Sequence, residues 1–261
     1  MSIKRLLFAL FLITLATSIQ AETINCTPIT SVPVTITAQG LYCLTGNVAT
    51  SQTTGNAITI NANNVTLDLN GWKVGGQGAG LGTQAFGIVS SSNNVTIKNG
   101  IVRGFYWGIE LTGNGAVVQG MLVDSNIYVG ITADGLGALV ENNQVVNTGS
   151  DTLSAVFAID AEGTSATIIN NTVAGMTVTS GGSEYGILMY GGGTARDNVI
   201  SNTALPSGGG SSYGIYQTGT AINNTVTELT YGIYGGVYAY NTDNGCTTSF
   251  SGGIAGAGNS P

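Results

Sequence analysis

The stretch FGIVSSSNNVTIKN, residues 86–99, contains the unit from which most of the chain is built. An aromatic residue, a glycine and an isoleucine open it, and a short polar turn follows. The unit ends in a segment that alternates apolar and polar residues, closed by an Asn-Gly pair at residues 99–100. Alternation with a period of two is typical of a half-buried β-strand. We therefore interpret the unit as strand, turn, strand and bend.

The opening pair of this unit recurs along the chain at intervals of 18 to 30 residues. The pairs are Ala57-Ile58, Gly87-Ile88, Gly108-Ile109, Gly130-Ile131, Ala158-Ile159, Gly186-Ile187, Gly214-Ile215 and Gly232-Ile233. A shortest interval near 20 residues with variable additions indicates a constant coil that carries loops of different length. No helical period is present beyond the N-terminal region. We expect parallel strands stacked about 4.8 Å apart, with the isoleucines inside.

A polar pair follows each opening pair after 9 to 13 residues. These pairs are Asn70-Gly71, Asn99-Gly100, Gln119-Gly120, Asn142-Asn143, Asn170-Asn171, Asp197-Asn198 and Asn223-Asn224. The second member is always Gly or Asn, and both residues tolerate the left-handed backbone conformation. We therefore expect a bend there in every coil, with amide side chains that hydrogen-bond along the stack.

The composition excludes some classes of function. Charged residues make up 7% of the 261 residues, against roughly 25% in ordinary domains. There are six basic residues, no histidine and a net charge of −7. A nucleic-acid-binding role is excluded on this basis, because a phosphate backbone requires a cluster of cations.

The N-terminus is typical of an exported protein. Lys4 and Arg5 precede an apolar run, and cleavage is expected after Ala21. The run is too short to span a membrane, so we predict a secreted or periplasmic protein that is not embedded in a membrane. That compartment permits disulfides, and Cys26 and Cys43 flank one strand-like segment. We predict a bridge between them, with three free thiols as the alternative, and a buried thiol at Cys246.

These features divide the chain into three parts: a signal peptide at residues 1–21, an N-terminal cap segment at 22–55, and the repeats with a short tail at 56–261. The cap is expected because the end of a stack exposes backbone and apolar groups. Longer additions occur at one point of the repeat, at residues 75–85, 147–155, 176–184 and 201–212. Such loops either wall a groove or are simply tolerated there.

The VTLDLNG segment at residues 65–71 and the VTIKNG segment at 95–100 resemble the right-handed parallel β-helix superfamily, the pectin-lyase-like fold. The Gly-Ile openings and asparagine corners share this resemblance, which covers about residues 56–245. It implies an all-β, right-handed solenoid of about eight coils. Members include polysaccharide lyases, glycoside hydrolases, epimerases, adhesins and phage spikes, so the fold alone does not define an activity.

Four carboxylates are the candidate catalytic residues. With each isoleucine facing inward, the next residue faces outward, which places Glu110 and Asp160 on one face. Asp134 and Glu162 follow two residues further along neighbouring coils and share that face. Spacings of about 4.8 and 9.6 Å suit the carboxylate pairs of glycoside hydrolases, and the same oxygens could hold Ca²⁺. The alternative is an acidic face that only contacts solvent.

Aromatic residues form a second set. Phe86, Trp107, Phe157, Tyr185, Tyr213 and Tyr231 each precede an opening pair. We expect this column to pack in the core or at a turn. Tyr216 and Tyr234 instead follow the isoleucine, with Tyr190 nearby, and these three are candidates for substrate binding. An exposed tyrosine offers a sugar both a ring face and a hydroxyl.

The catalytic motifs that the resemblance would imply are missing. Hydrolases of the superfamily carry a Gly-His-Gly element, and epimerases and several lyases an Asp-Pro-His motif, whereas this chain has no histidine. Arg103 and Arg196 lack the Arg-x-Pro context of pectate lyases. We predict a secreted protein that binds polysaccharide or a surface partner through the acidic and tyrosine face. The alternatives are a polysaccharide-processing enzyme with paired carboxylates and a purely structural or adhesive solenoid.

Overall fold

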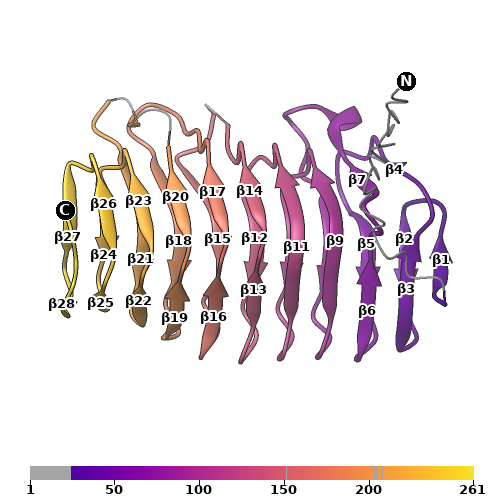
Figure 1. Ribbon diagram of the computed structural model, residues 1–261. Coiled ribbons are helices and arrows are strands. Elements are labelled where there is room, and N and C mark those ends of the chain that lie inside the picture. The colour runs from indigo at the N-terminus through magenta and orange to yellow at the C-terminus, as the bar shows by residue number, and fades with distance from the viewer. Residues whose placement is uncertain (1–24, 151, 203–204, 207) are drawn as a thin grey trace, which may run out of the picture.

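The computed structural model describes residues 25–150, 152–202, 205–206 and 208–261. The predicted signal peptide, residues 1–21, lies outside the described residues. Within the described ranges the chain forms 28 β-strands and one short 3-10 helix, η1 (Gln77–Ala79). The strands make two sheets, of 18 and 10 strands, in which successive coils pair in parallel. Figure 1 shows these coils side by side along one axis, from the indigo to the yellow end. The chain is a parallel β-helix.

The ten-stranded sheet takes one strand from each coil. Its strands in order are β2 (Val34–Ile36), β5 (Asn56–Ile60), β8 (Phe86–Ser90), β10 (Trp107–Leu111), β12 (Val129–Ala133), β15 (Ala155–Asp160), β18 (Ser183–Met189), β21 (Ser211–Gln217), β24 (Tyr231–Tyr234) and β27 (Thr248–Ser251). The outer side of this sheet holds every residue of the candidate site except those in the turn after each strand.

The 18-stranded sheet folds around the rest of each coil in two rows. The first row contains β1 (Thr27–Ile29), β3 (Gly40–Leu44), β6 (Val65–Asp68), β13 (Leu139–Glu141), β16 (Ala166–Ile169), β19 (Gly193–Arg196), β22 (Thr220–Ile222), β25 (Val237–Ala239) and β28 (Ile254–Ala255). The second row contains β4 (Val48–Ala49), β7 (Lys73–Gly75), β14 (Gln144–Val146), β17 (Thr172–Ala174), β20 (Val199–Ser201), β23 (Thr225–Thr227) and β26 (Thr242–Asn244). β9 (Thr96–Arg103) and β11 (Val117–Asp124) run through both rows.

The predicted isoleucine column is confirmed. Backbone pairing aligns Ile58, Ile88, Ile109, Ile131, Ile159, Ile187, Ile215 and Ile233 in direct register. All eight side chains are fully buried in one continuous core. Burial of one such side chain contributes about 1.5–3 kcal/mol, so the column is a principal source of stability and register.

Glycine precedes most of these isoleucines because neighbouring backbones approach closely there. A Cβ added at Gly87 would lie 2.3 Å from the carbonyl oxygen of Gly108, and one at Gly108 would lie 2.6 Å from that of Gly130. The next coil therefore leaves little room for a side chain at this position.

The bend between the two rows differs from the prediction. The left-handed residue is the first member of the polar pair, as at Asn99 (φ 56°), Asn142 (φ 56°) and Asn170 (φ 55°). The Gln119-Gly120 pair was aligned one residue out of register, because Gln119 pairs with Lys98. Gly120 (φ 61°) thus matches Asn99. The second member points inward instead, which frees its side chain to bond along the stack.

The predicted amide stack is confirmed at this inward position. Asn143, Asn171, Asn198, Asn224 and Asn241 are all buried. The side-chain oxygen of each accepts a hydrogen bond from the backbone N–H of the residue one coil before it, at 2.9–3.0 Å. Each amide nitrogen also donates to a backbone carbonyl. The ladder therefore satisfies buried backbone groups that the bend removes from the sheet.

The N-terminal segment continues the same stack, because β2, β3 and β4 pair with β5, β6 and β7. Whether residues 22–55 act as a cap, and the count of about eight coils, stay predictions. The Cys26–Cys43 disulfide is confirmed, with a Cα–Cα distance of 5.8 Å. Cys246 is free but only half-buried, because it lies in the turn between β26 and β27 and packs against the core from there. No helix among the described residues is long and apolar enough to cross a membrane.

Asn171→Ala should destabilise the fold by about 3 kcal/mol, because it leaves the backbone N–H and the amide of Asn143 without their acceptor. Urea unfolding followed by circular dichroism measures this change. Asn170→Gly is the matched control, since Asn170 is exposed and left-handed, and it should change stability by less than about 0.5 kcal/mol. Equal effects of the two substitutions would contradict the role of the ladder.

Candidate functional site: an acidic and aromatic face

The candidate site lies on the outer side of the ten-stranded sheet and in the turn that follows its strands. Because Ile109, Ile131 and Ile159 face the core, the residue after each one faces outward. Backbone pairing aligns Glu110 with Thr132, and Thr132 with Asp160. The three side chains form one column across β10, β12 and β15.

Asp134 and Glu162 lie beside this column, one residue beyond β12 and two beyond β15. The backbone N–H of Glu162 donates to Oδ1 of Asp134 at 3.0 Å, which fixes the two residues on neighbouring coils. The four predicted carboxylates therefore belong to one surface that spans three coils. We name this set of Glu110, Asp134, Asp160 and Glu162 the acidic cluster.

Burial and mutual repulsion disfavour ionisation of carboxylates in the acidic cluster. Burial raises the pKa of Asp160 from 3.8 to about 7, and the charges of Asp134 and Glu162 add to this effect. Burial also raises the pKa of Glu110, with a further contribution from Asp134. The pKa of Asp134 is raised by burial, and the hydrogen bond from Glu162 opposes that change. Asp160 therefore gains and loses its proton near neutral pH, because burial and the neighbouring carboxylates disfavour its ionised form.

Two oxygen atoms in this column have no hydrogen-bond partner among the residues that the structure describes. One is Oγ1 of Thr132, whose side chain is 5% exposed. The other is Oδ1 of Asp160. Buried polar atoms are usually paired, so these two exceptions on neighbouring strands of the outward column mark a place that lacks hydrogen-bond donors.

The three candidate tyrosines lie further along the same face. Tyr216 pairs with Leu188, which pairs with Asp160, so the tyrosines continue the carboxylate column. The rings of Tyr216 and Tyr234 stack with centroids 4.9 Å apart. Tyr190, 47% exposed, meets the ring of Tyr216 edge to face at 5.6 Å.

The second aromatic column lies on this outer face, which corrects the expectation of core or turn packing. These rings are half-buried and are absent from the core cluster, because each stands on the outward side of its strand, two residues before the buried isoleucine. Phe157, Tyr185, Tyr213 and Tyr231 stack at successive centroid distances of 5.0–5.1 Å with interplanar angles near 10°. Tyr213 also contacts Tyr216 edge to face at 5.2 Å, which joins the two columns into one aromatic surface.

Three further residues of interest were not predicted. Thr132 follows Ile131, so the sequence pattern already places it in the outward column and the register confirms this, but an uncharged threonine gave no reason to count it among the site residues. Val129 occupies the position that carries a ring in the neighbouring coils. Tyr128, one residue before the strand, supplies the missing ring through contacts with Trp107 and Phe157. In the sequence, the sign of this was an aromatic residue one position before the place that the aromatic column takes in other coils.

Glu184 is the third, and it lies at a core position of β18 in register with Val156. It accepts a hydrogen bond from Nδ2 of Asn202 at 2.6 Å, and burial raises its pKa to about 7. It had been assigned to the end of a loop.

The predicted loops connect the second row to the ten-stranded sheet, at one corner of successive coils (Figure 1). They pair with one another, as where the backbone N–H of Thr179 donates to the carbonyl of Leu153 and that of Ser183 donates to Ser154. These contacts extend the starts of β15 and β18 beyond the aromatic column. The described loops therefore border the outer face along that edge.

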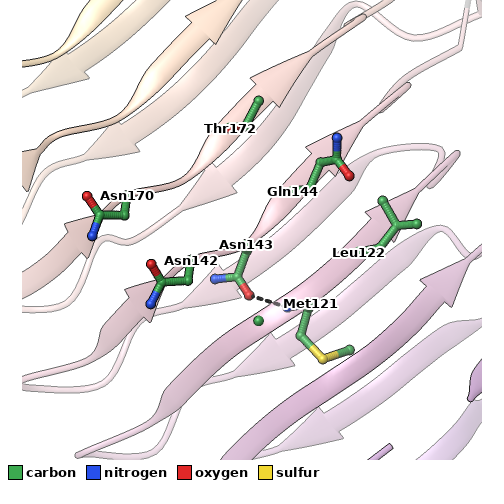
Figure 2. A pocket seen from close by; sticks show the side chains of 8 residues that line it. Met121, Leu122, Asn142, Asn143, Gln144, Asn170 and Thr172 are labelled. Carbon is green, nitrogen blue, oxygen red and sulfur yellow. Dashed lines mark hydrogen bonds between the residues drawn. The ribbon is translucent and has the colours of Figure 1, made fainter. Parts of the chain in front are cut away.

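A separate hollow of about 440 Å³ lies over the bend of the 18-stranded sheet (Figure 2). Asn142, Asn143, Gln144, Asn170 and Thr172 line it together with residues 120–122. It contains no carboxylate and no residue of the ten-stranded sheet, so we do not place the site there. The described residues also contain no group of three or more acidic or cysteine side chains that could hold a metal ion.

The four basic residues that the structure describes all lie in the 18-stranded sheet. Lys98 pairs with Asp68 at 3.3 Å, Arg103 with Asp124 at 2.9 Å, and Arg196 with Asp197 at 2.8 Å. The outer face of the ten-stranded sheet thus combines carboxylates and aromatic rings without a cation among its described residues.

Comparisons with known proteins identify the fold. No protein-family model and no curated protein matches the chain. The enzymatically active domain of tailspike protein 2 from bacteriophage CBA120 matches 88% of this chain and 38% of its own, with a TM-score of 0.57 and 14% identity. The Dettilon tailspike protein gp208 matches 89% of this chain and 58% of its own, with a TM-score of 0.57 and 16% identity. The chain therefore spans less than two thirds of either tailspike, and it shares with them the right-handed parallel β-helix.

Proposed function

We propose that the chain binds polysaccharide along the outer face of the ten-stranded sheet, outside the cytoplasm. The observation that carries this proposal is the register that joins Glu110, Asp160, Tyr216 and Tyr234 into one outward column. The Cys26–Cys43 disulfide fits an oxidising compartment. The fold shared with two tailspike proteins is compatible with this role.

The two halves of the face supply different contacts. Stacked tyrosine rings present apolar edges and hydroxyl groups, which suit the C–H faces and hydroxyls of a sugar ring. Carboxylates accept hydrogen bonds from sugar hydroxyls, and those bonds are stronger than bonds between neutral groups. Because equivalent residues repeat at every coil, we expect a linear glycan to lie across the strands, along the axis of the helix.

Replacement of Tyr216 and Tyr234 together by alanine should raise the Kd for a polysaccharide bound by the wild type by at least about tenfold, because both ring faces are lost. A glycan array followed by titration calorimetry gives the measurement. Tyr240→Ala is the control, since Tyr240 is 59% exposed and lies after β25 on the other sheet. The binding proposal fails if the wild type binds no glycan, or if the double variant binds as the wild type does.

A second candidate function, glycoside hydrolysis, is favoured by one observation. Asp160 has a pKa raised to about 7 and lies beside Asp134 and Glu162, which places a candidate proton donor next to two further carboxylates. Glu110 and Asp160 are two coils apart, or roughly 9.6 Å along the stack, close to the separation of inverting enzymes. Asp134 and Glu162 are one coil apart, near the shorter separation of retaining enzymes.

Hydrolysis predicts that the wild type releases reducing ends from a neutral or acidic polysaccharide, and that Glu110→Gln combined with Asp160→Asn lowers the rate by at least about a hundredfold. A reducing-sugar assay with and without Ca²⁺ measures this. Glu141→Gln, in β13 of the other sheet, is the matched control. If the wild type cleaves no polysaccharide in this screen, hydrolysis is excluded and binding is retained.

Asp160→Asn should also change how stability depends on pH. The pKa of Asp160 is higher in the folded chain than in the unfolded chain, so the folded state binds more protons between about pH 4 and pH 7. Wild-type stability therefore falls through this window and stays lower above it. Asp160→Asn should match the wild type near pH 4 and exceed it by about 1–3 kcal/mol near pH 8.

Urea unfolding at the two pH values measures the difference between wild type and variant. Glu184, whose pKa is also raised to about 7, is present in both proteins, so its contribution to the pH dependence cancels in this difference. Glu141→Gln should follow the wild-type profile. A constant difference between Asp160→Asn and the wild type at both pH values would contradict the raised pKa.

A further inference from the structure

We propose that this face selects glycans that carry protonated amino groups over neutral or acidic glycans of the same backbone. The inference rests on the proposed polysaccharide binding and names its substrate class. It is carried by two independent features: the separation of charge between the two sheets, and the unpartnered oxygen atoms of Thr132 and Asp160.

The separation of charge leaves the acidic cluster without a counter-ion among the described residues. Lys73, Lys98, Arg103 and Arg196 all lie in the 18-stranded sheet. The last three already pair with aspartates of their own region. A uronic acid would therefore meet the carboxylates of Glu110 and its neighbours with no cation to compensate, and like charges would repel it. A cationic ligand would instead be attracted by the same carboxylates.

The unpartnered atoms show where hydrogen-bond donors are needed. Thr132 lies between Glu110 and Asp160 in the outward column, is 5% exposed, and its Oγ1 has no partner among the described residues. Oδ1 of Asp160, in register with Thr132, also has none. A protonated amine carries three N–H donors and a positive charge, so one such group can satisfy both oxygens.

The surroundings suit an organic ammonium group better than a metal ion. No three acidic side chains among the described residues converge as metal ligands, whereas an ammonium group is satisfied by two or three oxygens from one side. The ring of Tyr128 meets that of Phe157 edge to face at 5.6 Å, and Phe157 lies in the same strand as Asp160. A ring that lies near a bound cation attracts it by about 0.5–1 kcal/mol at exposed sites.

The test compares two probes with one backbone, a hexamer of glucosamine and a hexamer of N-acetylglucosamine, at about pH 6, where free amines are largely protonated. Titration calorimetry of the full chain should give a Kd at least about tenfold lower for the glucosamine hexamer. The triple variant Glu110→Gln, Asp160→Asn, Glu162→Gln should lose this preference and bind the acetylated hexamer within about threefold of the wild type. Glu141→Gln should keep the preference.

Each other outcome overturns the inference. Equal affinities of the wild type for the two hexamers, or a preference for the acetylated one, exclude selection by charge but leave glycan binding intact. A preference that survives in the triple variant would reflect general attraction to an acidic protein. If neither hexamer binds, the inference fails, and binding of other glycans in the array decides the proposed function separately. The wild-type comparison stands even if the triple variant does not fold.

Discussion

Parallel backbone pairing between successive coils is the constraint on which the rest of this structure depends. It holds equivalent residues of neighbouring coils about 4.8 Å apart, so any residue type that repeats becomes a continuous column. Inside the helix this rule produces the fully buried isoleucine column and the asparagine ladder from Asn143 to Asn241. Outside, the same pairing aligns residues that need not repeat, and the candidate site is built there from Glu110, Thr132, Asp160 and Tyr216.

This division explains what sequence could and could not predict. The Gly-Ile pairs predicted the inward column and hence the outward one, because each strand alternates sides from its isoleucine onward. The bend was misplaced, since Asn is compatible with both the left-handed position of Asn170 and the buried ladder position of Asn171. Composition cannot separate these two roles. The aromatic column was expected in the core or at a turn, whereas the glycine and the isoleucine are both buried in succession, which leaves the ring before them on the outer side.

Thr132 shows the limit of pattern analysis most clearly. A single threonine on a strand rich in apolar residues carries no signal of function. The repeat places it between two carboxylates, whereas its 5% exposure and the oxygen that lacks a donor follow only from the stacked structure. The raised pKa of Asp160 likewise depends on burial and on neighbours from other coils, which are remote in the sequence. Fold and columns therefore follow from local repeats, whereas the electrostatics of the site follow from the stack as a whole.

The face also has a direction along the helix. Carboxylates occupy the coils of β10, β12 and β15, and tyrosines occupy those of β18, β21 and β24, with buried Leu188 at the boundary. Along this column a linear ligand would meet carboxylates at one end and tyrosine rings at the other, while the second aromatic column runs beside both halves. Reversal of the ligand would exchange these contacts. The solenoid thus supplies a uniform spacing, and the irregular outward residues supply polarity, so one face can both align a chain-like ligand and define its orientation.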